Sequence, residues 1–337
     1  MKVLFIGGTG TISGAVSELA VARGVDLYLL NRGNRSEFLA PGAKNIKGDI
    51  RNVDAISGLL KDRRFDVVVD WVAFTREHVE ADVRLFAGKT GQYVFISSAS
   101  VYQKPLEHYP VTESTPLGNP YAEYSRNKII CEEYLMSQHQ GRGFPVTIVR
   151  PSYTYNRTRI PHIFNSKSRE YSLVERMRKG KRIIVPGDGT SLWTLTHAAD
   201  FAKGIVGLFG NAKATGNAVH ITSDEVLSWD QITRLIGKAC GAEPRVAHVS
   251  SEFICAFAPG LVGSLIGDKS VSVVLDNSKI KRLVPEYVAT IPFSEGIEQS
   301  VQWYDADPKR RVIDEEYNSL VDQILSAHDA GMAMAKG

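Results

Sequence analysis

The sequence is poor in cysteine and has no long apolar run, and both scarcities limit the class of protein. Only three cysteines occur among 337 residues, too few and too far apart for a disulfide framework or a zinc cluster. The most apolar later segment, residues 253–266, is interrupted by proline and glycine and is shorter than the roughly 20 residues that span a bilayer. Residues 1–6 are typical of a buried strand rather than a signal peptide. We therefore expect a cytoplasmic protein with no membrane segment and no metal site.

An excess of charge of one sign is also missing. Forty Lys and Arg face 37 Asp and Glu, a net charge of +3, which requires no polyanionic partner and excludes none. Hydrophobic residues make up 43% and charged residues 23%, values that exclude intrinsic disorder and indicate a real core. The length is about twice that of a typical domain, which predicts two domains or one large domain with an appendage.

Two periodicities alternate along the first 150 residues. Short apolar runs occupy residues 3–6, 27–30, 67–69, 93–96 and 146–149, and segments with helical spacing occupy residues 12–23, 53–60, 76–86 and 122–138. Continuous apolar strands alternating with helices indicate a parallel sheet covered on both faces. With right-handed crossovers this predicts an α/β fold with a doubly wound parallel sheet of the Rossmann type.

The regular alternation of strands and helices ends after residue 151. We expect residues 152–196 to be mostly irregular, a helix near residue 198, a strand at 219–221, and a helix from the capping box at 228–231 to residue 240. Residues 313–334 predict an amphipathic terminal helix that packs on its own domain. The expected division is a dinucleotide-binding domain at 1–151, to whose sheet some later segments return. Residues 152–337 then form mainly a smaller α/β substrate domain with a C-terminal helix.

A glycine-rich turn, Gly7-Gly8-Thr9-Gly10, joins the first strand to the first helix. Glycines in that position make a tight turn and let backbone N–H groups at a helix N-terminus reach a pyrophosphate. An ordinary tight turn is the alternative. Ser13 stands where the pattern has its third glycine, but the phosphate turn itself is intact.

The end of the second strand indicates which dinucleotide is bound. An NAD site usually offers a carboxylate there for the ribose diol, whereas this chain has Asn31, followed by Arg32 and Arg35. Guanidinium groups pair well with a phosphate, so these residues favour NADP over NAD, unless both arginines face water. Asp49 ends the third strand, where it could accept a hydrogen bond from the adenine amino group.

A tyrosine and a lysine lie four residues apart in the helix after the fifth strand, at Tyr124 and Lys128. That spacing places them on one face, and the ammonium should lower the pKa of the tyrosine, making it a usable acid or base. The fifth strand ends in a run of hydroxyl residues that includes Ser98 and Ser100. We expect these groups to meet at the carboxyl edge of the sheet.

Taken together, these motifs resemble the extended short-chain dehydrogenase/reductase family, which includes nucleotide-sugar epimerases and dehydratases. The resemblance runs over nearly the whole chain and rests on the glycine turn, Asp49, the Ser-Ser-x-x-Val-Tyr stretch that begins at residue 97, the Tyr–Lys pair, Arg150-Pro151, and the segments 187–189 and 197–200. It implies that Ser98, Tyr124 and Lys128 are the catalytic residues of an NAD(P)-dependent oxidoreductase or epimerase. The implied reaction is hydride transfer at a carbinol or keto carbon of a sugar-like or nucleotide-sugar substrate.

Each catalytic residue receives a role from the resemblance. Tyr124 exchanges the hydroxyl proton, Ser98 hydrogen-bonds the same oxygen, and Lys128 holds the ribose and keeps Tyr124 acidic. The cofactor-binding residues implied are Gly7, Gly10, Thr11, Ile12, Asn31, Arg32, Arg35, Asp49, Ile50, Ala73, Tyr124, Lys128 and Pro151.

Two departures concern the substrate. Trp193 stands where epimerases of the family usually have an arginine for the nucleotide diphosphate, and Tyr155-Asn156-Arg157 replaces the usual Tyr-Gly-Pro. Trp193 could stack on a sugar or pack in the core. The Asp-Glu pair of the dehydratases is replaced by Ala99-Ser100, which disfavours dehydration. The candidate substrate residues are Ser100, Tyr153, Asn156, Arg157, His162 and Trp193.

A different class of function stays open, because the chain also resembles the chloroplast stem-loop RNA-binding proteins. Residues 176–182 contain five basic side chains that could contact phosphates, or could simply form a solvated helix end. The intact Ser-Tyr-Lys set favours an enzyme, so we expect a small-molecule partner rather than nucleic acid. The resemblance also suggests a homodimer through the helix that carries the Tyr–Lys pair.

Overall fold

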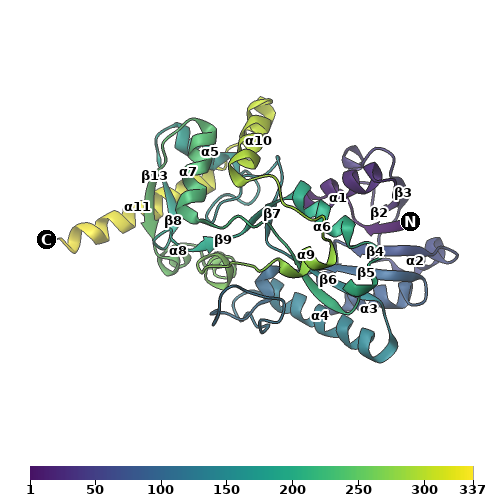
Figure 1. Cartoon of the computed structure of the whole chain (residues 1–337). Coiled ribbons are helices and arrows are strands. Elements are labelled where there is room, and N and C mark those ends of the chain that lie inside the picture. The colour runs from purple at the N-terminus through teal and green to yellow at the C-terminus, as the bar shows by residue number, and fades with distance from the viewer. Residues whose placement is uncertain (337) are drawn as a thin grey trace.

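The computed structural model describes residues 1–336, and its centre is a seven-stranded parallel sheet. The strand order is β11-β6-β5-β4-β1-β2-β3, and every neighbouring pair is parallel. The strands are β1 (Lys2–Ile6), β2 (Asp26–Asn31), β3 (Lys44–Lys47), β4 (Phe65–Asp70), β5 (Thr90–Ile96), β6 (Val146–Pro151) and β11 (Asn217–Ile221). The predicted doubly wound Rossmann sheet is confirmed, and the late strand β11 forms one of its edges (Figure 1).

Helices cover both faces of the sheet because its strands carry apolar side chains on both sides. Val3 and Phe5 of β1 pack with α1 (Thr11–Ala22) and α6 (Ala198–Gly207) on one face. Leu4 and Ile6 point the other way, toward α2 (Val53–Leu60), α3 (Arg76–Phe86) and α4 (Glu123–Arg142). The four helices expected in this part of the chain therefore form within a few residues of the predicted limits.

The later part of the chain builds a second body beside the carboxyl edge of the sheet. Its core surrounds a parallel pair, β8 (Arg182–Pro186) with β13 (Arg245–Val249), and includes the buried side chain of Trp229. Two short pairs join the bodies, β7 (Tyr153–Tyr155) with β10 (Leu195–His197) and β9 (Leu192–Trp193) with β12 (Leu227–Ser228). Its helices are α5 (Tyr171–Arg178), α7 (Trp229–Cys240), α8 (Ser251–Phe257), α10 (Phe293–Asp305) and α11 (Glu315–Met334), while α9 (Ser278–Leu283) packs against the central sheet.

Residues 152–196 differ from the expectation of an irregular segment. They contain α5 and four of the short strands. The apolar residues Leu173, Val174 and Met177 of α5 are buried, but charged neighbours in the sequence mask their helical spacing. The capping box before α7 is confirmed. The Ser228 hydroxyl accepts from the Gln231 backbone N–H, and the Gln231 side-chain oxygen accepts from the Ser228 backbone N–H.

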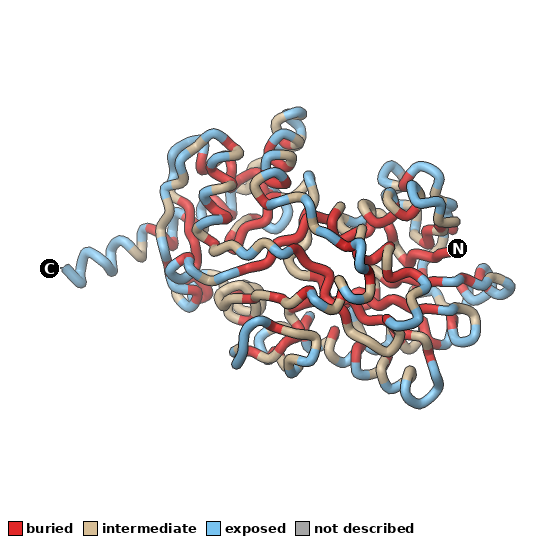
Figure 2. Tube along the Cα trace, viewed as in Figure 1, coloured by how far each residue is buried: buried red, intermediate tan, exposed pale blue. Residues whose placement is uncertain are grey.

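Buried residues lie in the interior of both bodies, and exposed residues lie on their outer helices and loops (Figure 2). The terminal helix α11 packs on its own body through Tyr317, Val321, Ile324 and Leu325, as its periodicity predicts, while its last turns project into solvent. Over residues 1–336 we find no helix that combines the length and the apolar character needed to cross a bilayer. The same residues contain no cluster of three or more His, Cys, Asp or Glu suited to a metal ion.

Candidate active site

Two pockets open at the carboxyl edge of the central sheet, where ligands of such sheets bind. The first, of about 500 Å³, lies beside the turns after β1, β2, β3 and β4; we call it the glycine-turn pocket. The second, of about 600 Å³, contains Ser98 and Tyr124; we call it the tyrosine pocket. Phe74 of the first pocket lies 6.3 Å, centroid to centroid, from the Tyr124 ring of the second, so the two pockets adjoin.

The glycine turn has the backbone that only glycine adopts without strain. Gly7 and Gly8 have φ of +101° and +108°, and a Cβ on Gly8 would lie 2.7 Å from Leu29 Cδ2. Gly10 precedes α1, and its N–H donates to Ser13 Oγ at 2.8 Å. The serine that replaces the third glycine therefore fastens the turn, and Thr11 and Ile12 begin the helix after it.

The far end of the same pocket holds the residues expected at the ribose and adenine. Arg32, Arg35, Asp49 and Ile50 all line it. Asn31 also lines the pocket, but its amide is used inside the protein, donating to Asn45 and accepting from the Gly33 N–H at 2.9 Å each. The arginines are therefore the groups available to a ligand at this end.

Arg51 is a pocket residue that the sequence did not single out. One terminal nitrogen of its guanidinium donates to the Val72 carbonyl, while the other, Nη1, is buried without a hydrogen-bond partner. A buried cationic donor without a partner is costly. This orphaned donor and the glycine cradle both fit the anionic, hydrogen-bonding body of a dinucleotide.

Lys128 lines neither pocket and is only 2% exposed, but its surroundings connect it to residues of both. Its Nζ donates to the carbonyls of Ala73 and Ile96 at 2.7 Å each and lies 4.7 Å and 4.6 Å from the ring centroids of Phe74 and Phe95. Burial lowers the pKa of Lys128 to about 8, against the opposing charge of Asp70. The ammonium form therefore predominates at neutral pH but is lost in mild alkali.

The loop that holds Lys128 is itself held by a buried carboxylate. Asp70, at the end of β4, accepts from the backbone N–H groups of Val72 and Ala73 at 2.6 and 2.9 Å. The Tyr93 hydroxyl lies between Asp70 and Asp82. Burial, followed by the charge of Asp70, raises the pKa of Asp82 well above its usual value. Asp82 therefore holds a proton more readily than an ordinary aspartate does.

Tyr124 and Ser98 face each other in the tyrosine pocket. Ser98 Oγ lies 2.9 Å from Ser100 Oγ, which accepts from Ser125 Oγ at 2.8 Å. The structure corrects one expectation: the pKa of Tyr124 is raised, not lowered. The main cause is partial desolvation of the hydroxyl in the pocket, although the residue as a whole is 46% exposed; Asp268 adds to the shift and the Ser98 hydroxyl opposes it. The Lys128 ammonium is engaged by carbonyls and lies 5.8 Å from the Tyr124 ring centroid, on the expected side of the helix.

A buried ion pair supports the floor of this pocket. Arg150, at the end of β6, donates to both carboxylate oxygens of Glu132 and to the Tyr102 hydroxyl. Both charged side chains are at most 5% exposed. The next residue, Pro151, lines the pocket as expected.

The structure gathers some of the candidate substrate residues and separates others. Ser100 and Tyr153 line the tyrosine pocket, whereas the other four do not. Asn156 donates to the Thr11 carbonyl at 3.1 Å, and Arg157 is exposed elsewhere on the surface. Trp193 is 3% exposed and packs on Trp229, 5.6 Å between ring centroids, so it belongs to the core.

His162 is also a core residue. It is 3% exposed, its Nδ1 accepts from the Phe164 N–H, and its Nε2 donates to Thr233 Oγ. Burial lowers its pKa to about 4. Both ring nitrogens are used inside the protein, so the structure provides no site for a ligand there.

The opposite wall of the tyrosine pocket was missed from the sequence. Seven residues of the segment 259–269 line it together with Lys167: Pro259, Gly260, Val262, Gly263, Ser264, Asp268 and Lys269. Glycine and proline interrupt any periodicity in this segment. Only the fold brings it to the site.

Comparisons with known proteins agree with this architecture. The chain is 28% identical over 261 residues to the chloroplast stem-loop binding protein of 41 kDa b of Arabidopsis thaliana, covering 73% of this chain but only 65% of that protein. It is 24% identical over 254 residues to the 2'-dehydrokanamycin reductase of Streptomyces kanamyceticus, covering 75% and 70%. Over a shorter stretch of 171 residues it is 33% identical to the UDP-glucose 4-epimerase of Lactobacillus helveticus, covering 44% and 51%.

Solved structures and a family model extend the comparison. The epimerase Mth375 of Methanothermobacter thermautotrophicus superposes with a TM-score of 0.74 at 16% identity, covering 91% of this chain and 93% of that one. A UDP-glucuronic acid 4-epimerase of Bacillus cereus, in complex with UDP-glucuronic acid and NAD, gives 0.72 at 22% identity, covering 91% and 99%. At these identities the likeness shows the fold. The model of the NAD dependent epimerase/dehydratase family matches residues 3–221, more than half of the chain, and the protein belongs to that family.

Proposed function

We propose that the protein is an NAD(P)-dependent reductase or epimerase that transfers hydride at a carbinol or keto carbon of a sugar-like substrate. The observation that carries the proposal is the placement of Ser98 and Tyr124 in one pocket with the Lys128 ammonium directly behind them. An acid–base hydroxyl, a second hydroxyl donor and a cation at one strand edge are the groups such a reaction needs.

Residues of the glycine-turn pocket would hold the dinucleotide. The N–H groups of Thr11 and Ile12 lie at the N-terminus of α1, where the helix dipole favours a pyrophosphate, while Gly10 gives the turn its shape and donates its own N–H to Ser13. Arg51 Nη1 offers the pocket a donor that the protein leaves unused. When bound, the nicotinamide supplies or accepts the hydride. Asp49 and Ile50 would contact the adenine side.

Lys128 would hold the ribose beside the reacting carbon. An ammonium has three donors, and two are bound to the Ala73 and Ile96 carbonyls, which leaves one for a ribose hydroxyl. The carbonyls fix the position of Nζ, so the lysine is oriented before any ligand arrives.

Tyr124 would move the proton of the substrate hydroxyl. Its raised pKa makes the neutral phenol the resting form, suited to donating a proton to the oxygen of a carbonyl under reduction. Ser98 would donate a second hydrogen bond to the same oxygen. Oxidation or epimerisation requires the phenolate, so a positive charge brought by the oxidised cofactor would have to favour its formation.

NADP is the preferred cofactor in this proposal. Arg32 and Arg35 line the ribose end of the pocket, whereas the Asn31 amide is bound to Asn45 and Gly33. A site without a carboxylate for the ribose diol but with two guanidinium groups suits a 2′-phosphate.

Binding of a nucleic-acid stem-loop, such as one of RNA, is the second candidate, since the plant relative is named a stem-loop binding protein. The basic run at 176–182 does not support it, because most of its cations are paired with carboxylates of the same chain. Arg176 pairs with Asp322 and Arg178 with Asp305. Lys179 pairs with Glu175 and Arg182 with Asp329. We therefore place the enzyme first.

Isotope transfer tests the proposed function even while the substrate is unidentified. The protein is incubated with NADPH deuterated on the nicotinamide and a set of keto sugars, and the products are analysed by mass spectrometry. The proposal expects deuterium on one carbinol carbon, together with net cofactor oxidation for a reductase. Absence of transfer to any sugar, under conditions in which the cofactor binds, contradicts it.

A further inference from the structure

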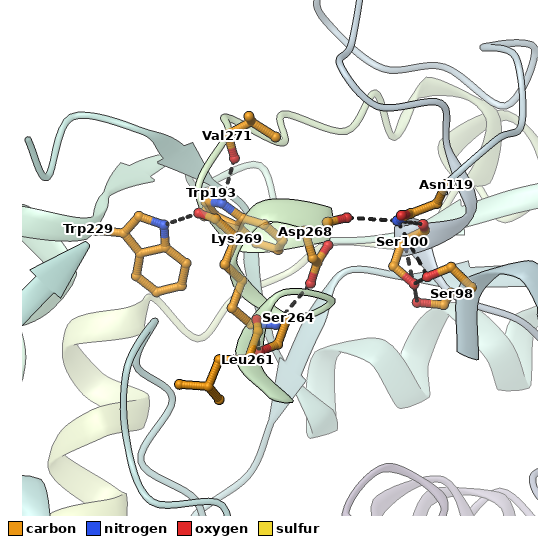
Figure 3. A network of polar contacts seen from close by, with 12 residues as sticks. Ser98, Ser100, Asn119, Trp193, Trp229, Leu261, Ser264, Asp268, Lys269 and Val271 are labelled. Atoms are coloured by element: carbon orange, nitrogen blue, oxygen red, sulfur yellow. Dashed lines mark hydrogen bonds and ion pairs between the residues drawn. The ribbon is translucent and has the colours of Figure 1, made fainter. Parts of the chain in front are cut away.

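The tyrosine pocket contains an ion pair opposite Ser98 (Figure 3). Lys269 Nζ lies 2.9 Å from Asp268 Oδ2, and the two side chains are 20% and 16% exposed. The ammonium also lies 5.1 Å from the ring centroid of Tyr153. Burial acts to lower the pKa of Lys269, but the Asp268 carboxylate raises it above its ordinary value. The lysine therefore carries its positive charge, and the Asp268 carboxylate balances that charge.

Three side chains hold the backbone that presents this pair (Figure 3). Asn119 Nδ2 donates to the Gly267 carbonyl at 2.7 Å and to the Ser100 carbonyl at 2.8 Å, so it links the two walls of the pocket. Trp229 Nε1 donates to the Lys269 carbonyl and Trp193 Nε1 to the Val271 carbonyl, each at 3.0 Å. The π-helical turn Leu265–Lys269 is thus fixed from both sides, and Asp268 and Lys269 are preorganised.

The charges of the pocket lining cancel. Asp268 and Glu123 contribute two carboxylates, and Lys269 and Lys167 contribute two ammonium groups. Glu123 and Lys167 are exposed, whereas the Asp268–Lys269 pair lies inside. In the described part of the chain, no arginine lines this pocket. A diphosphate carries about two negative charges and is typically held by guanidinium forks or several unpaired cations, which this lining does not offer.

Hydroxyl groups dominate what remains. Ser98, Ser100, Ser152, Ser264, Tyr121 and Tyr153 all line the pocket. Neutral hydroxyls with a carboxylate that accepts hydrogen bonds match the polyhydroxylated surface of a sugar. Trp193 cannot assist a phosphate, because its only donor is bound to the Val271 carbonyl.

We infer that the substrate is a polyhydroxylated sugar that carries no phosphate, and that Asp268, held by Lys269, determines this specificity. The inference rests on the proposed function, since the hydroxyl that Tyr124 deprotonates or protonates must belong to the same sugar. The Asp268 carboxylate accepts hydrogen bonds from sugar hydroxyls and repels a diphosphate. Lys269 keeps that carboxylate in place without presenting a free cation.

Calorimetric titration of the full chain, saturated with NADPH, tests the exclusion of diphosphates. UDP and UDP-glucose should show no binding to the wild-type protein up to millimolar concentration. Asp268→Asn keeps the shape but leaves Lys269 unpaired inside the pocket, so this variant should gain salt-sensitive UDP binding by about tenfold or more. Lys269→Met is the matched control, because it removes the cation, and should gain nothing.

Micromolar binding of UDP-glucose to the wild-type protein overturns the inference. So does an Asp268→Asn variant that folds, binds NADPH and still ignores UDP.

Transfer of deuterium from labelled NADPH distinguishes this inference from the proposed function. Wild-type protein is offered keto sugars without phosphate and, separately, 4-keto UDP-sugars. Label in the phosphate-free set is the expected result. Label only in the UDP-sugars overturns the inference while the proposed function stands, and label in neither overturns both.

Discussion

At the scale of single residues, the charge of Lys128 depends on a few neighbouring groups. Burial lowers its pKa to about 8, Asp70, Cys131 and Glu132 act to raise it, and Arg51 acts to lower it. The ammonium is the form that would bind the ribose. As pH rises through about 8, the fraction of that form falls.

Dinucleotide affinity should therefore weaken above about pH 8. Lys128→Met should weaken binding at neutral pH and remove the alkaline limb, since no titrating group remains at that position. Calorimetric titration of NADPH between about pH 6 and about pH 10 measures both effects. A wild-type affinity that is flat across this range, or a limb that persists in Lys128→Met, contradicts the assignment.

Variants of Asp70 and Asp82 form a matched pair that tests the same alkaline limb, the loss of NADPH affinity above about pH 8. Asp70→Asn removes a charge that raises the pKa of Lys128, so the limb should move to lower pH. Asp82→Asn should leave the limb in place, because Asp82 is not among the charged groups that shift the pKa of Lys128. Equal shifts in the two variants would mean that packing, rather than charge, positions Lys128.

The proposed preference for NADP rests on Arg32 and Arg35. Charge-assisted hydrogen bonds contribute about 1.5–3 kcal/mol, so Arg32→Ala should weaken NADPH by at least about tenfold. NADH, which lacks the 2′-phosphate, should bind almost unchanged. Calorimetry on both cofactors measures the difference, and wild-type protein that binds NADH as tightly as NADPH would remove the preference while leaving the dinucleotide site.

At the scale of elements, the C-terminal end of α5 separates the enzyme from an RNA-binding protein. Its arginines are bound to carboxylates of the surrounding chain, and Arg176 is 1% exposed. Purified protein should therefore show only weak binding to a stem-loop RNA at physiological salt. Tight binding in an electrophoretic mobility assay, abolished by Arg178→Ala with Lys181→Ala, would place the RNA function first.

Elements with an uninterrupted period were predictable, and elements defined by distant partners were not. The strands of the sheet, the glycine turn and the Tyr124–Lys128 face of α4 follow from local spacing. The apolar stripe of α5 is hidden among charged residues whose pairing partners lie far along the chain, such as Asp305 and Asp322.

The raised pKa of Tyr124 could not be read from the sequence for a similar reason. The i,i+4 spacing correctly places Lys128 on its side of the helix, but not the Ala73 and Ile96 carbonyls that engage the ammonium. Nor does any local pattern place Asp268 near the tyrosine, because Asn119, Trp193 and Trp229 hold that turn through tertiary contacts. The placement of site residues was predictable where it depends on spacing within a single element, as for Tyr124 and Lys128 in α4.

At the scale of the whole molecule, the buried His162 links stability to pH. Its pKa is lowered to about 4 in the folded protein from an ordinary value of 6.5, so between these values the unfolded chain binds more protons. The contribution is fully present above pH 6.5 and is lost as pH falls toward 4, by about 3 kcal/mol.

Denaturant unfolding at several pH values, compared between the wild-type protein and His162→Leu, should isolate this loss. Glu170, whose pKa is raised to about 7 mainly by burial, acts in the opposite direction over part of the same range. The comparison with His162→Leu is therefore the decisive one. In the variant, the free energy of unfolding should fall less steeply as the pH is lowered from about 6.5 to about 4. The same pH dependence in both proteins would show that His162 is not held neutral.

The proton-transfer role of Tyr124 is the central claim, and single-turnover kinetics of Tyr124→Phe tests it most directly. The substitution keeps the ring and removes the proton that the reaction must move. With the sugar identified by isotope transfer, the rate of hydride transfer should fall by about 10²–10⁴-fold while NADPH affinity changes little. Ser98→Ala should cost less, because it removes one hydrogen bond to the reacting oxygen. A Tyr124→Phe protein that transfers hydride at the wild-type rate would contradict the account.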